Sequence, residues 1–446
     1  MKSFLSLLIA LLLPLSAASA EESVSFRSDI APILLERCLA CHGPQKAEGG
    51  YRVDSFAQAT SEGDSFMPGF VPEDIESSEA LRRITSDDPA ERMPLEGEKL
   101  PATEIAKIQR WVEEGARFDG ENPAAPLASI VPPPQHPDPP SEYRHPLPIT
   151  ALCFDASGNR LFASGYHEVT VWNSATGELV QRIRNAPQRV YALALSPDGK
   201  LLAVAGGSPG RSGEVRLFAA DSGELRQVLN ATSDVVLDVA FDPAGERLAA
   251  AGADNIVRIF DAATFEQQRQ LTSHSDWVMD IAWDASGKRL VSASRDKSVK
   301  VFDAENGDLL VTYAGHGAMV HGAVFHPDGK QVYSAGADKK LHRWTIQDGK
   351  QEADSTLGAE LYKLELADGQ LFVPAADGMT YQLDAAKHAD VQSYGDPSSP
   401  VLAASYNSEQ RLLATGTFHG QIEIRKPRDD GAVRSFIAAP GYNRTP

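Results

Sequence analysis

The hydrophobic positions of the chain follow two different periods. Between residues 23 and 118, apolar residues recur three and four positions apart, which is the spacing of helices with one buried face. From residue 149 onward, short apolar runs of strand length alternate with turns that contain glycine. The pattern predicts a small all-α domain followed by a larger all-β domain.

Two helices are expected at the two ends of the α-helical region. The first begins near Ser28-Asp29, which can cap it, has Pro32 in its first turn, and runs to His42. The second opens at Pro101 and ends at Gly115. Its apolar stripe consists of Ile105, Ile108, Trp111 and Val112. Two such helices are expected to pack across each other.

Seven similar units follow residue 149. Each has a strand-like run, a small turn, a second strand, a turn that often contains an acidic residue, and a third strand that mostly ends in an aromatic residue. The glycines of the first six small turns are 41, 46, 42, 42 and 40 residues apart: Gly158, Gly199, Gly245, Gly287, Gly329 and Gly369. The seventh turn, Asn407–Gln410, is degenerate. Repeats of this length with several short strands predict a seven-bladed β-propeller.

A closed ring of blades would leave no exposed sheet edges between blades. The pattern leaves two ways to complete the last blade. Either Val433–Ala438 supplies its outer strand, or the segment before Ile149 does so.

The first twenty residues have the pattern of an export signal. Lys2 precedes the apolar run Phe4–Leu15, and Ala18-Ser19-Ala20 supplies the small residues of a cleavage site. The run is too short to span a bilayer, and no cysteine follows the cleavage site to carry a lipid. We therefore expect an exported protein without a transmembrane segment, in the periplasm or outside the cell, whose mature form begins at Glu21.

Prolines are dense between residues 119 and 148, where they cannot continue a helix or join a sheet. This stretch is expected to be an extended, semi-rigid linker. The predicted segments are a signal peptide (1–20), a helical domain (21–118), a proline-rich linker (119–148) and a propeller (149–446).

The sequence Cys38-Leu39-Ala40-Cys41-His42 carries the clearest candidate chemistry. On a helix, Cys38 and Cys41 would share a face and could each form a thioether with one haem, and His42 could be the proximal iron ligand. A redox disulfide and half of a zinc site are the alternatives. A zinc site would need a second Cys/His pair, whereas the remaining cysteine, Cys153, stands alone in a strand-like run. We therefore expect one covalently bound haem c.

Two Met-Pro pairs compete to supply the distal iron ligand, Met67-Pro68 and Met93-Pro94. A thioether favours ferrous iron, and the adjacent proline stiffens the loop that carries it. Met93 is favoured because it lies shortly before the last helix of the domain, and Met67 is the second choice.

Five blocks of the helical region resemble the planctomycete-type cytochrome c domain, in the same order. They are Phe26–Leu34, Cys38–Pro44, Gly49–Asp54, Arg92-Met93-Pro94 and Trp111–Ala116. The resemblance implies that the CxxCH sequence binds haem and that the Met of the Arg-Met-Pro block is the distal ligand. Tyr51 departs from the family, which usually has an aliphatic residue at that place.

The β units resemble WD repeats, most closely at Ala253–Asp261 and Arg295–Asp303. His274 and Gly315-His316 stand where that family has its Gly-His. Several aromatic strand ends are replaced or missing, so an incomplete side-chain hydrogen-bond network is expected. The histidines and turn aspartates of these units, which are His274, His316, Asp254, Asp296 and Asp338, are interpreted as structural residues rather than as a metal or catalytic site.

The chain is acidic, with 61 acidic and 42 basic residues and a formal net charge of -19, which becomes -20 without residues 1–20. This charge disfavours nucleic acid and anionic membranes as partners. Residues 21–118 contain 20 acids and 11 bases. A redox partner protein with a basic surface is therefore expected, and salt should weaken its binding.

The sequence favours an exported mono-haem c-type cytochrome that transfers single electrons, because His and Met ligands leave no open position on the iron. The propeller would dock a further protein partner. Two alternatives stay open: an oxidoreductase with an active site in the propeller that passes electrons to the haem, and an interaction scaffold with a sensing haem. No repeat carries a nucleophile beside a base, so the sequence favours electron transfer and binding over catalysis.

Overall fold

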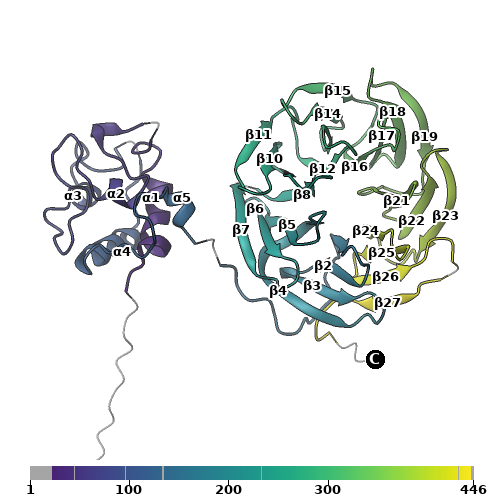
Figure 1. Cartoon of the computed structure of the whole chain (residues 1–446), viewed down its shortest axis with the longest axis horizontal. Coiled ribbons are helices and arrows are strands. Elements are labelled where there is room, and N and C mark those ends of the chain that lie inside the picture. The colour runs from purple at the N-terminus through teal and green to yellow at the C-terminus, as the bar shows by residue number, and fades with distance from the viewer. Residues whose placement is uncertain are drawn as a thin grey trace, which may run out of the picture. The chain divides into compact units, whose positions relative to one another are not determined.

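The structure, a computed structural model, describes residues 23–44, 46–95, 97–132, 135–232, 234–429 and 431–442. The chain divides into two compact units, residues 1–134 and 135–446 (Figure 1), and the division falls inside the predicted linker. The predicted signal peptide, residues 1–20, lies outside the described residues. Within the described ranges, no helix has the length and apolar character needed to cross a membrane.

The first unit is helical and small. Its elements are a π-helical turn η1 (Phe26–Ile30), α1 (Ala31–Arg37), a 3-10 turn η2 (Glu48–Gly50), α2 (Phe56–Ala59), α3 (Glu79–Thr85), α4 (Ala102–Glu113) and α5 (Leu127–Ile130). The predicted second helix is confirmed as α4, which follows Pro101 and buries Ile108, Trp111 and Val112.

The first predicted helix is shorter than expected, because α1 ends at Arg37. The amide of Leu39 donates to the carbonyl of Leu34, five residues back, at 2.9 Å, which widens the last turn and stops the regular helical ladder. A separate turn follows, in which the Cys38 carbonyl accepts the amides of Cys41 and His42 at 3.2 and 3.0 Å. The CxxCH sequence therefore lies in a turn just beyond α1.

Four aromatic rings form the centre of the first unit. Trp111 is only 1% exposed, and its ring centroid lies 5.3 Å from that of Phe26 and 5.4 Å from that of Phe70. Phe56 adds an edge-to-face contact with Phe26 at 5.0 Å. The Trp111 indole also donates a hydrogen bond to the Arg117 carbonyl at 3.0 Å. This cluster joins α4 to η1 and α2.

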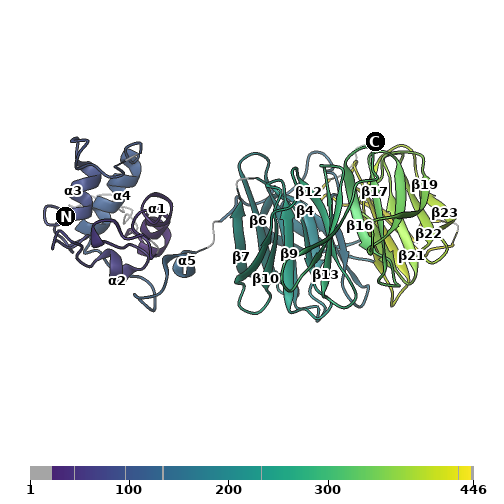
Figure 2. The ribbon, with the colours of Figure 1, turned by 90° about the horizontal axis from the view of Figure 1, so that it is seen from above.

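The second unit is a ring of antiparallel sheets, seen along its axis in Figure 1 and from the side in Figure 2. One sheet has seven strands and five sheets have four strands each. The seven-stranded sheet contains β1 (Leu152–Phe154), β2 (Arg160–Ser164), β3 (Tyr166–Asn173), β4 (Leu179–Leu195), β5 (Leu201–Ser208), β6 (Ser212–Ala219) and β7 (Leu225–Thr232).

The next two sheets contain β8 (Val236–Phe241), β9 (Arg247–Gly252), β10 (Val257–Asp261) and β11 (Gln267–Leu271), then β12 (Val278–Trp283), β13 (Arg289–Ser294), β14 (Val299–Asp303) and β15 (Leu309–Tyr313). The last three contain β16 (Val320–Phe325), β17 (Gln331–Gly336), β18 (Lys340–Thr345) and β19 (Gln351–Thr356), then β20 (Glu365–Ala367), β21 (Gln370–Pro374), β22 (Met379–Asp384) and β23 (Ala389–Gly395), and finally β24 (Val401–Asn407), β25 (Leu412–Thr417), β26 (Gln421–Arg425) and β27 (Arg434–Ile437).

The first seven strands form one sheet where the repeats predict two. The cause is β4, a strand of 17 residues. Its residues 179–184 pair with β3, and its residues 189–195 pair with β5. Because no turn interrupts β4, the outer strand of one repeat continues directly into the inner strand of the next.

The small turns of the repeats lie where they were predicted. They join the first and second strands of successive repeats, and the six glycines named above have φ between 66° and 72°, in the left-handed region that glycine adopts without strain. The last sheet is completed by the C-terminal segment, because Arg434–Ile437 pairs with β26. The first of the two closure alternatives is therefore confirmed.

Candidate functional site

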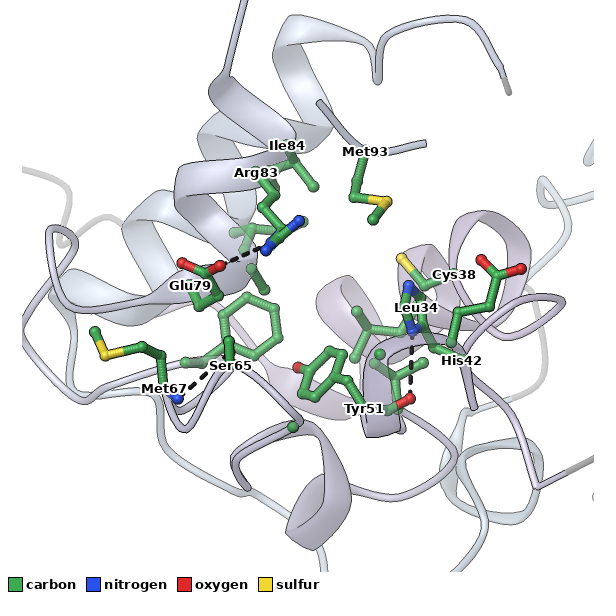
Figure 3. A pocket seen from close by; sticks show the side chains of 18 of the residues that line it. Leu34, Cys38, His42, Tyr51, Ser65, Met67, Glu79, Arg83, Ile84 and Met93 are labelled. Atoms are coloured by element: carbon green, nitrogen blue, oxygen red, sulfur yellow. Dashed lines mark hydrogen bonds and ion pairs between the residues drawn. The ribbon is translucent and has the colours of Figure 1, made fainter. Parts of the chain in front are cut away.

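The first unit contains a cavity of about 370 Å³. Its lining comes from α1, α3, α4, the turn beyond α1 and the loops between the helices (Figure 3). Most of its large side chains are apolar: Leu34, Val53, Phe70, Ile84, Leu100 and Ile108. Three of the predicted ligand residues, Cys38, His42 and Met93, line this one cavity, together with the second-choice residue Met67.

His42 is held so that one ring nitrogen is left for a ligand bond. Its Nδ1 lies 3.2 Å from the carbonyl oxygen of Tyr51. A carbonyl can only accept, so Nδ1 carries the proton and Nε2 carries the lone pair. The backbone is also fixed, because the His42 carbonyl accepts the Val53 amide at 2.8 Å. Such a carbonyl partner is typical of histidines that bind a metal.

The two candidate methionines differ in their surroundings. Met93 packs against the core of the unit, and its amide donates to the Arg83 carbonyl at the end of α3 at 3.1 Å. Met67 is 43% exposed. Figure 3 shows the Met93 side chain near Cys38, whereas Met67 lies on the other side of the cavity, beyond Glu79. The surroundings favour Met93 as a buried ligand.

The two cysteines of the motif are both free thiols in this structure. Cys38 lines the cavity, and burial raises the pKa of its thiol to about 12. Cys41 is exposed and is not among the residues that line the cavity. The third cysteine, Cys153, packs against an apolar cluster of the second unit, as expected for a small hydrophobic side chain.

Tyr51 contributes to the site through both its backbone and its ring. The hydroxyl donates to the Ala59 carbonyl at 2.6 Å, and burial raises the pKa of this phenol. A Cβ atom at Gly69 would lie 1.9 Å from the Tyr51 hydroxyl oxygen, so only glycine fits there. The sequence indicated Tyr51 only as one member of the block Gly49–Asp54.

The residues present fit a c-type haem. The His42 imidazole, with its defined lone pair, and the Met93 thioether line one cavity, and this pair matches the axial ligands of cytochromes c. The Cys38 thiol lines the same cavity and is placed for a thioether bond. Residues 38–97 match the family model of the planctomycete cytochrome C. Residues 177–218, 223–261, 265–303 and 307–345 match the model of the WD domain, G-beta repeat.

The chain carries a planctomycete-type cytochrome c domain followed by WD repeats. The domain order agrees with the resemblances drawn from the sequence. The cytochrome family points to a haem cofactor, and the WD propeller points to protein–protein interaction. A comparison with curated proteins gave no match.

The sequence predicts an incomplete side-chain network in the WD repeats, and the structure shows this network complete in one repeat and lacking a member in another. In one repeat His316 bonds Asp338 through Nδ1 and Ser334 through Nε2, and the Trp344 indole donates to the same Ser334 oxygen at 3.2 Å. In the preceding repeat His274 bonds Asp296 and Ser292, at 2.8 and 2.7 Å. That repeat has Phe302 in place of a tryptophan, so its network lacks the last member.

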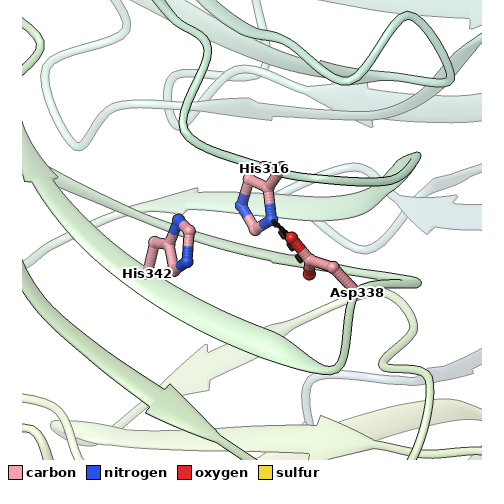
Figure 4. Close-up of side chains that lie close together, drawn as sticks. All are labelled: His316, Asp338 and His342. Carbon is pink, nitrogen blue, oxygen red and sulfur yellow. Dashed lines mark hydrogen bonds and ion pairs between the residues drawn. The ribbon is translucent and has the colours of Figure 1, made fainter.

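One group in the propeller has the composition of a metal site, namely His316, Asp338 and His342 (Figure 4). Ligand atoms of the three residues lie within 4.8 Å of one another. However, both ring nitrogens of His316 already have partners, and the two imidazole rings are stacked 4.2 Å apart at 17°. Imidazole lone pairs lie in the ring plane, so those of stacked rings do not converge on one ion. The geometry favours a structural network.

Charged side chains lie at the centre of the propeller, in a cavity of about 540 Å³ lined by the innermost strands. Lys363 pairs there with Asp238 at 2.5 Å and lies 3.9 Å from Asp280. Each aspartate also accepts a backbone amide of the neighbouring sheet at 2.8 Å, Asp238 that of Ile281 and Asp280 that of Ala323. Burial and the neighbouring Asp238 raise the pKa of Asp280.

Glu365 in the same cavity is expected to make the stability of the propeller depend on pH. Burial raises the pKa of its carboxyl from 4.5 to about 7, while one oxygen accepts the Tyr406 amide at 3.1 Å. A raised acid pKa means that folding favours the protonated form, so stability falls as pH rises from about 4.5 to about 7. Glu365→Gln keeps the amide acceptor, and we expect it to stabilise the propeller at pH 8 by about 2 kcal/mol.

Urea unfolding of the full chain at pH 5 and pH 8 checks this expectation. The difference in the free energy of unfolding between Glu365→Gln and the parent protein should be large at pH 8 and small at pH 5. Glu352→Gln, on the exposed outer strand β19, is the matched control and should change neither value. An equal effect of Glu365→Gln at both pH values would contradict the assignment.

Proposed function

We propose that this protein is an exported mono-haem c-type cytochrome that transfers single electrons and uses its propeller to dock a protein partner. The observation that carries the proposal is the single cavity lined by Cys38, His42 and Met93, with the His42 Nδ1 proton directed to the Tyr51 carbonyl. Bound haem would supply a one-electron couple between ferric and ferrous iron.

The residues of the cavity have distinct roles in this proposal. Cys38 and Cys41 would attach the haem through thioethers, and His42 and Met93 would bind its iron. Cys38 already lines the cavity, whereas Cys41 is exposed on the adjoining turn, where its thiol is accessible. The mostly apolar walls would limit the access of water to the iron, and the Arg83 carbonyl holds the loop that carries Met93.

The surface near the cavity supports a protein partner for electron transfer. In the described part of the cytochrome domain, the exposed large hydrophobic side chains are Phe66, Met67 and Leu95. Met67 lines the cavity, Phe66 precedes it, and Leu95 lies two residues after Met93. Acidic residues outnumber basic ones by 20 to 11 in residues 21–118. Exposed apolar groups on a domain with an excess of acidic residues suit a transient contact with a basic redox protein.

The proposal includes two points about the whole chain. Residues 1–20 have the pattern of an export signal, and covalent haem attachment belongs outside the cytoplasm. We also count seven blades, because β4 can be divided between two four-stranded blades, with residues 179–184 in the first and 189–195 in the second.

A visible spectrum tests the ligands directly. Protein exported from a host that matures c-type cytochromes should gain the mass of one haem and show a low-spin spectrum. Met93→Ala should abolish the charge-transfer band of the Met-to-iron bond, since this side chain packs into the cavity. Met67→Ala is the matched control, because it removes the other cavity methionine, and it should leave the band intact.

Each other outcome has a definite meaning. A colourless protein would contradict the haem assignment. If only Met67→Ala loses the band, the distal ligand is Met67 and not Met93. A high-spin spectrum in the parent protein would indicate an open iron position, which favours catalysis or sensing over electron transfer.

A further inference from the structure

Arg83 places a positive charge in a cavity whose walls are mostly apolar. It lies on α3 next to Arg82, but of the two only Arg83 lines the cavity. Figure 3 shows its guanidinium group pointing into the cavity, on the side away from Cys38 and His42. The Arg83 side chain is 33% exposed, so its charge is partly removed from water, and a partner of opposite charge offsets the cost of that removal.

The charge of Arg83 is only partly compensated. Its Nε donates to Oε1 of Glu79 at 2.7 Å. The same carboxylate also accepts two hydrogen bonds from Arg82, at 2.8 and 3.1 Å. Among the described residues, the two terminal nitrogens of Arg83 have no hydrogen-bond partner. Glu79 thus fixes the direction of the guanidinium group and leaves one edge of it, with two parallel N–H donors, open.

We propose that this open edge of Arg83 binds a carboxylate of the bound tetrapyrrole, a haem propionate. The inference rests on the proposed function, because it requires haem in the cavity. Two parallel donors match the two oxygens of a carboxylate, and such bidentate pairs are the strongest hydrogen bonds that arginine makes. Haem carries its propionates on the edge opposite its vinyl groups, and Arg83 lies across the cavity from Cys38, the thioether residue.

The pairing would also raise the reduction potential. A positive charge beside the haem disfavours the ferric state, which carries one more positive charge than the ferrous state. The loop that carries Met93 is held by a backbone hydrogen bond, from the Met93 amide to the Arg83 carbonyl, which a substitution of the Arg83 side chain keeps. A side-chain substitution at this residue therefore tests the charge and leaves the axial ligand in place.

The test compares the haem-loaded full chain with three variants. Arg83→Gln removes the charge, and Arg83→Lys keeps the charge but lacks the two parallel donors. Arg82→Gln is the matched control, because Arg82 is the neighbouring residue, shares Glu79 and does not line the cavity. The reduction potential is measured by spectroelectrochemistry, and the propionate bending band is recorded by resonance Raman spectroscopy.

We expect Arg83→Gln to lower the ratio of reduced to oxidised protein at a fixed potential about tenfold, which is about 59 mV for one electron. Arg83→Lys should lower it less, and both should shift the propionate band, while Arg82→Gln does neither. Equal shifts in Arg82→Gln and Arg83→Gln, or an unchanged band in both Arg83 variants, would overturn the inference while haem binding and the proposed function stand. If Arg83→Gln does not accumulate as folded protein, the propionate band of Arg83→Lys is the deciding measurement: a shifted band supports the inference, and an unchanged band overturns it. A parent protein without haem would overturn both proposals.

Discussion

Replacing Trp111 with alanine is expected to destabilise the cytochrome domain by about 3–5 kcal/mol, the usual cost of removing a large aromatic side chain from a core. The residue is 1% exposed, lies within 5.3 to 6.3 Å of three phenylalanine rings, and donates a hydrogen bond to the Arg117 carbonyl. Its loss would leave a cavity between α4, η1 and α2 and an unpaired carbonyl. For a domain with a total stability of about 5–15 kcal/mol, this is a large share.

Scanning calorimetry of the full chain measures this effect with the propeller as an internal reference. The transition of the cytochrome domain should move to a lower temperature, and that of the propeller should stay in place. Trp111→Phe keeps most of the apolar contact but loses the indole donor. Its transition temperature for the cytochrome domain should therefore lie between those of Trp111→Ala and the parent protein. Trp277→Ala, at a tryptophan of the propeller that is 36% exposed, is the control for the loss of an indole at the surface. An unchanged first transition in Trp111→Ala would contradict the role given to this core.

The grouping of the predicted ligand residues could be anticipated in part from the sequence, because these residue types have few other uses in such a pattern. The CxxCH sequence and the Met-Pro pair indicated which side chains should meet, and Cys38, His42 and Met93 do line one cavity. The Tyr51 carbonyl could not be predicted, since a backbone contact to His42 leaves no mark in the side-chain pattern. Arg83 was missed because an arginine on a short helix is usually solvated.

The repeat pattern of the propeller was also visible in the sequence, since each small turn requires a residue at positive φ. The one long interval between turn glycines holds the insertion Gly206–Gly213, and the structure places it in an extended β5–β6 hairpin where Ser208 pairs with Ser212. The fusion of two repeats through β4 was not predicted, because both halves of that strand have ordinary strand patterns. Only the missing turn between them makes them one strand.

The charged centre of the propeller could not be predicted, because its partners are far apart in the sequence. Lys363 and Asp238 are 125 residues apart: Asp238 lies in β8, and Lys363 lies two residues before β20 of another sheet. Gly322 stands at the place in β16 that Asp238 has in β8, and it permits the close approach of Lys363, since a Cβ at Gly322 would lie 2.9 Å from the Lys363 Cα. A lysine in a strand-like run usually points to solvent, so the sequence did not indicate that Lys363 pairs with Asp238.

Lys363→Met is expected to destabilise the propeller by about 3 kcal/mol, at the low end for loss of one partner of a buried ion pair. The lysine amine donates to the Leu237 carbonyl at 2.9 Å and to Asp238, and it offsets the charge of Asp280 nearby. Asp238 and Asp280 are 7% and 6% exposed, so water cannot fully replace the amine. The cost stays moderate because the Lys363 side chain itself is 32% exposed.

A double-mutant cycle separates this ion pair from simple packing. If the cost comes from the unpaired Asp238 carboxylate, Asp238→Asn should be much less harmful in the Lys363→Met background than alone, because the carboxylate that lost its direct partner is then absent. Lys387→Met is the matched control, since its side chain is 78% exposed and lies 3.7 Å from Asp384, and it should cost no more than about 0.5 kcal/mol. Urea unfolding at pH 7 gives the free energy of unfolding of the parent protein, the two single variants and the double variant. Additive effects of the two substitutions would mean that the sheets are joined at the ring centre by backbone hydrogen bonds and packing alone, and not by the charge that Lys363 brings across it.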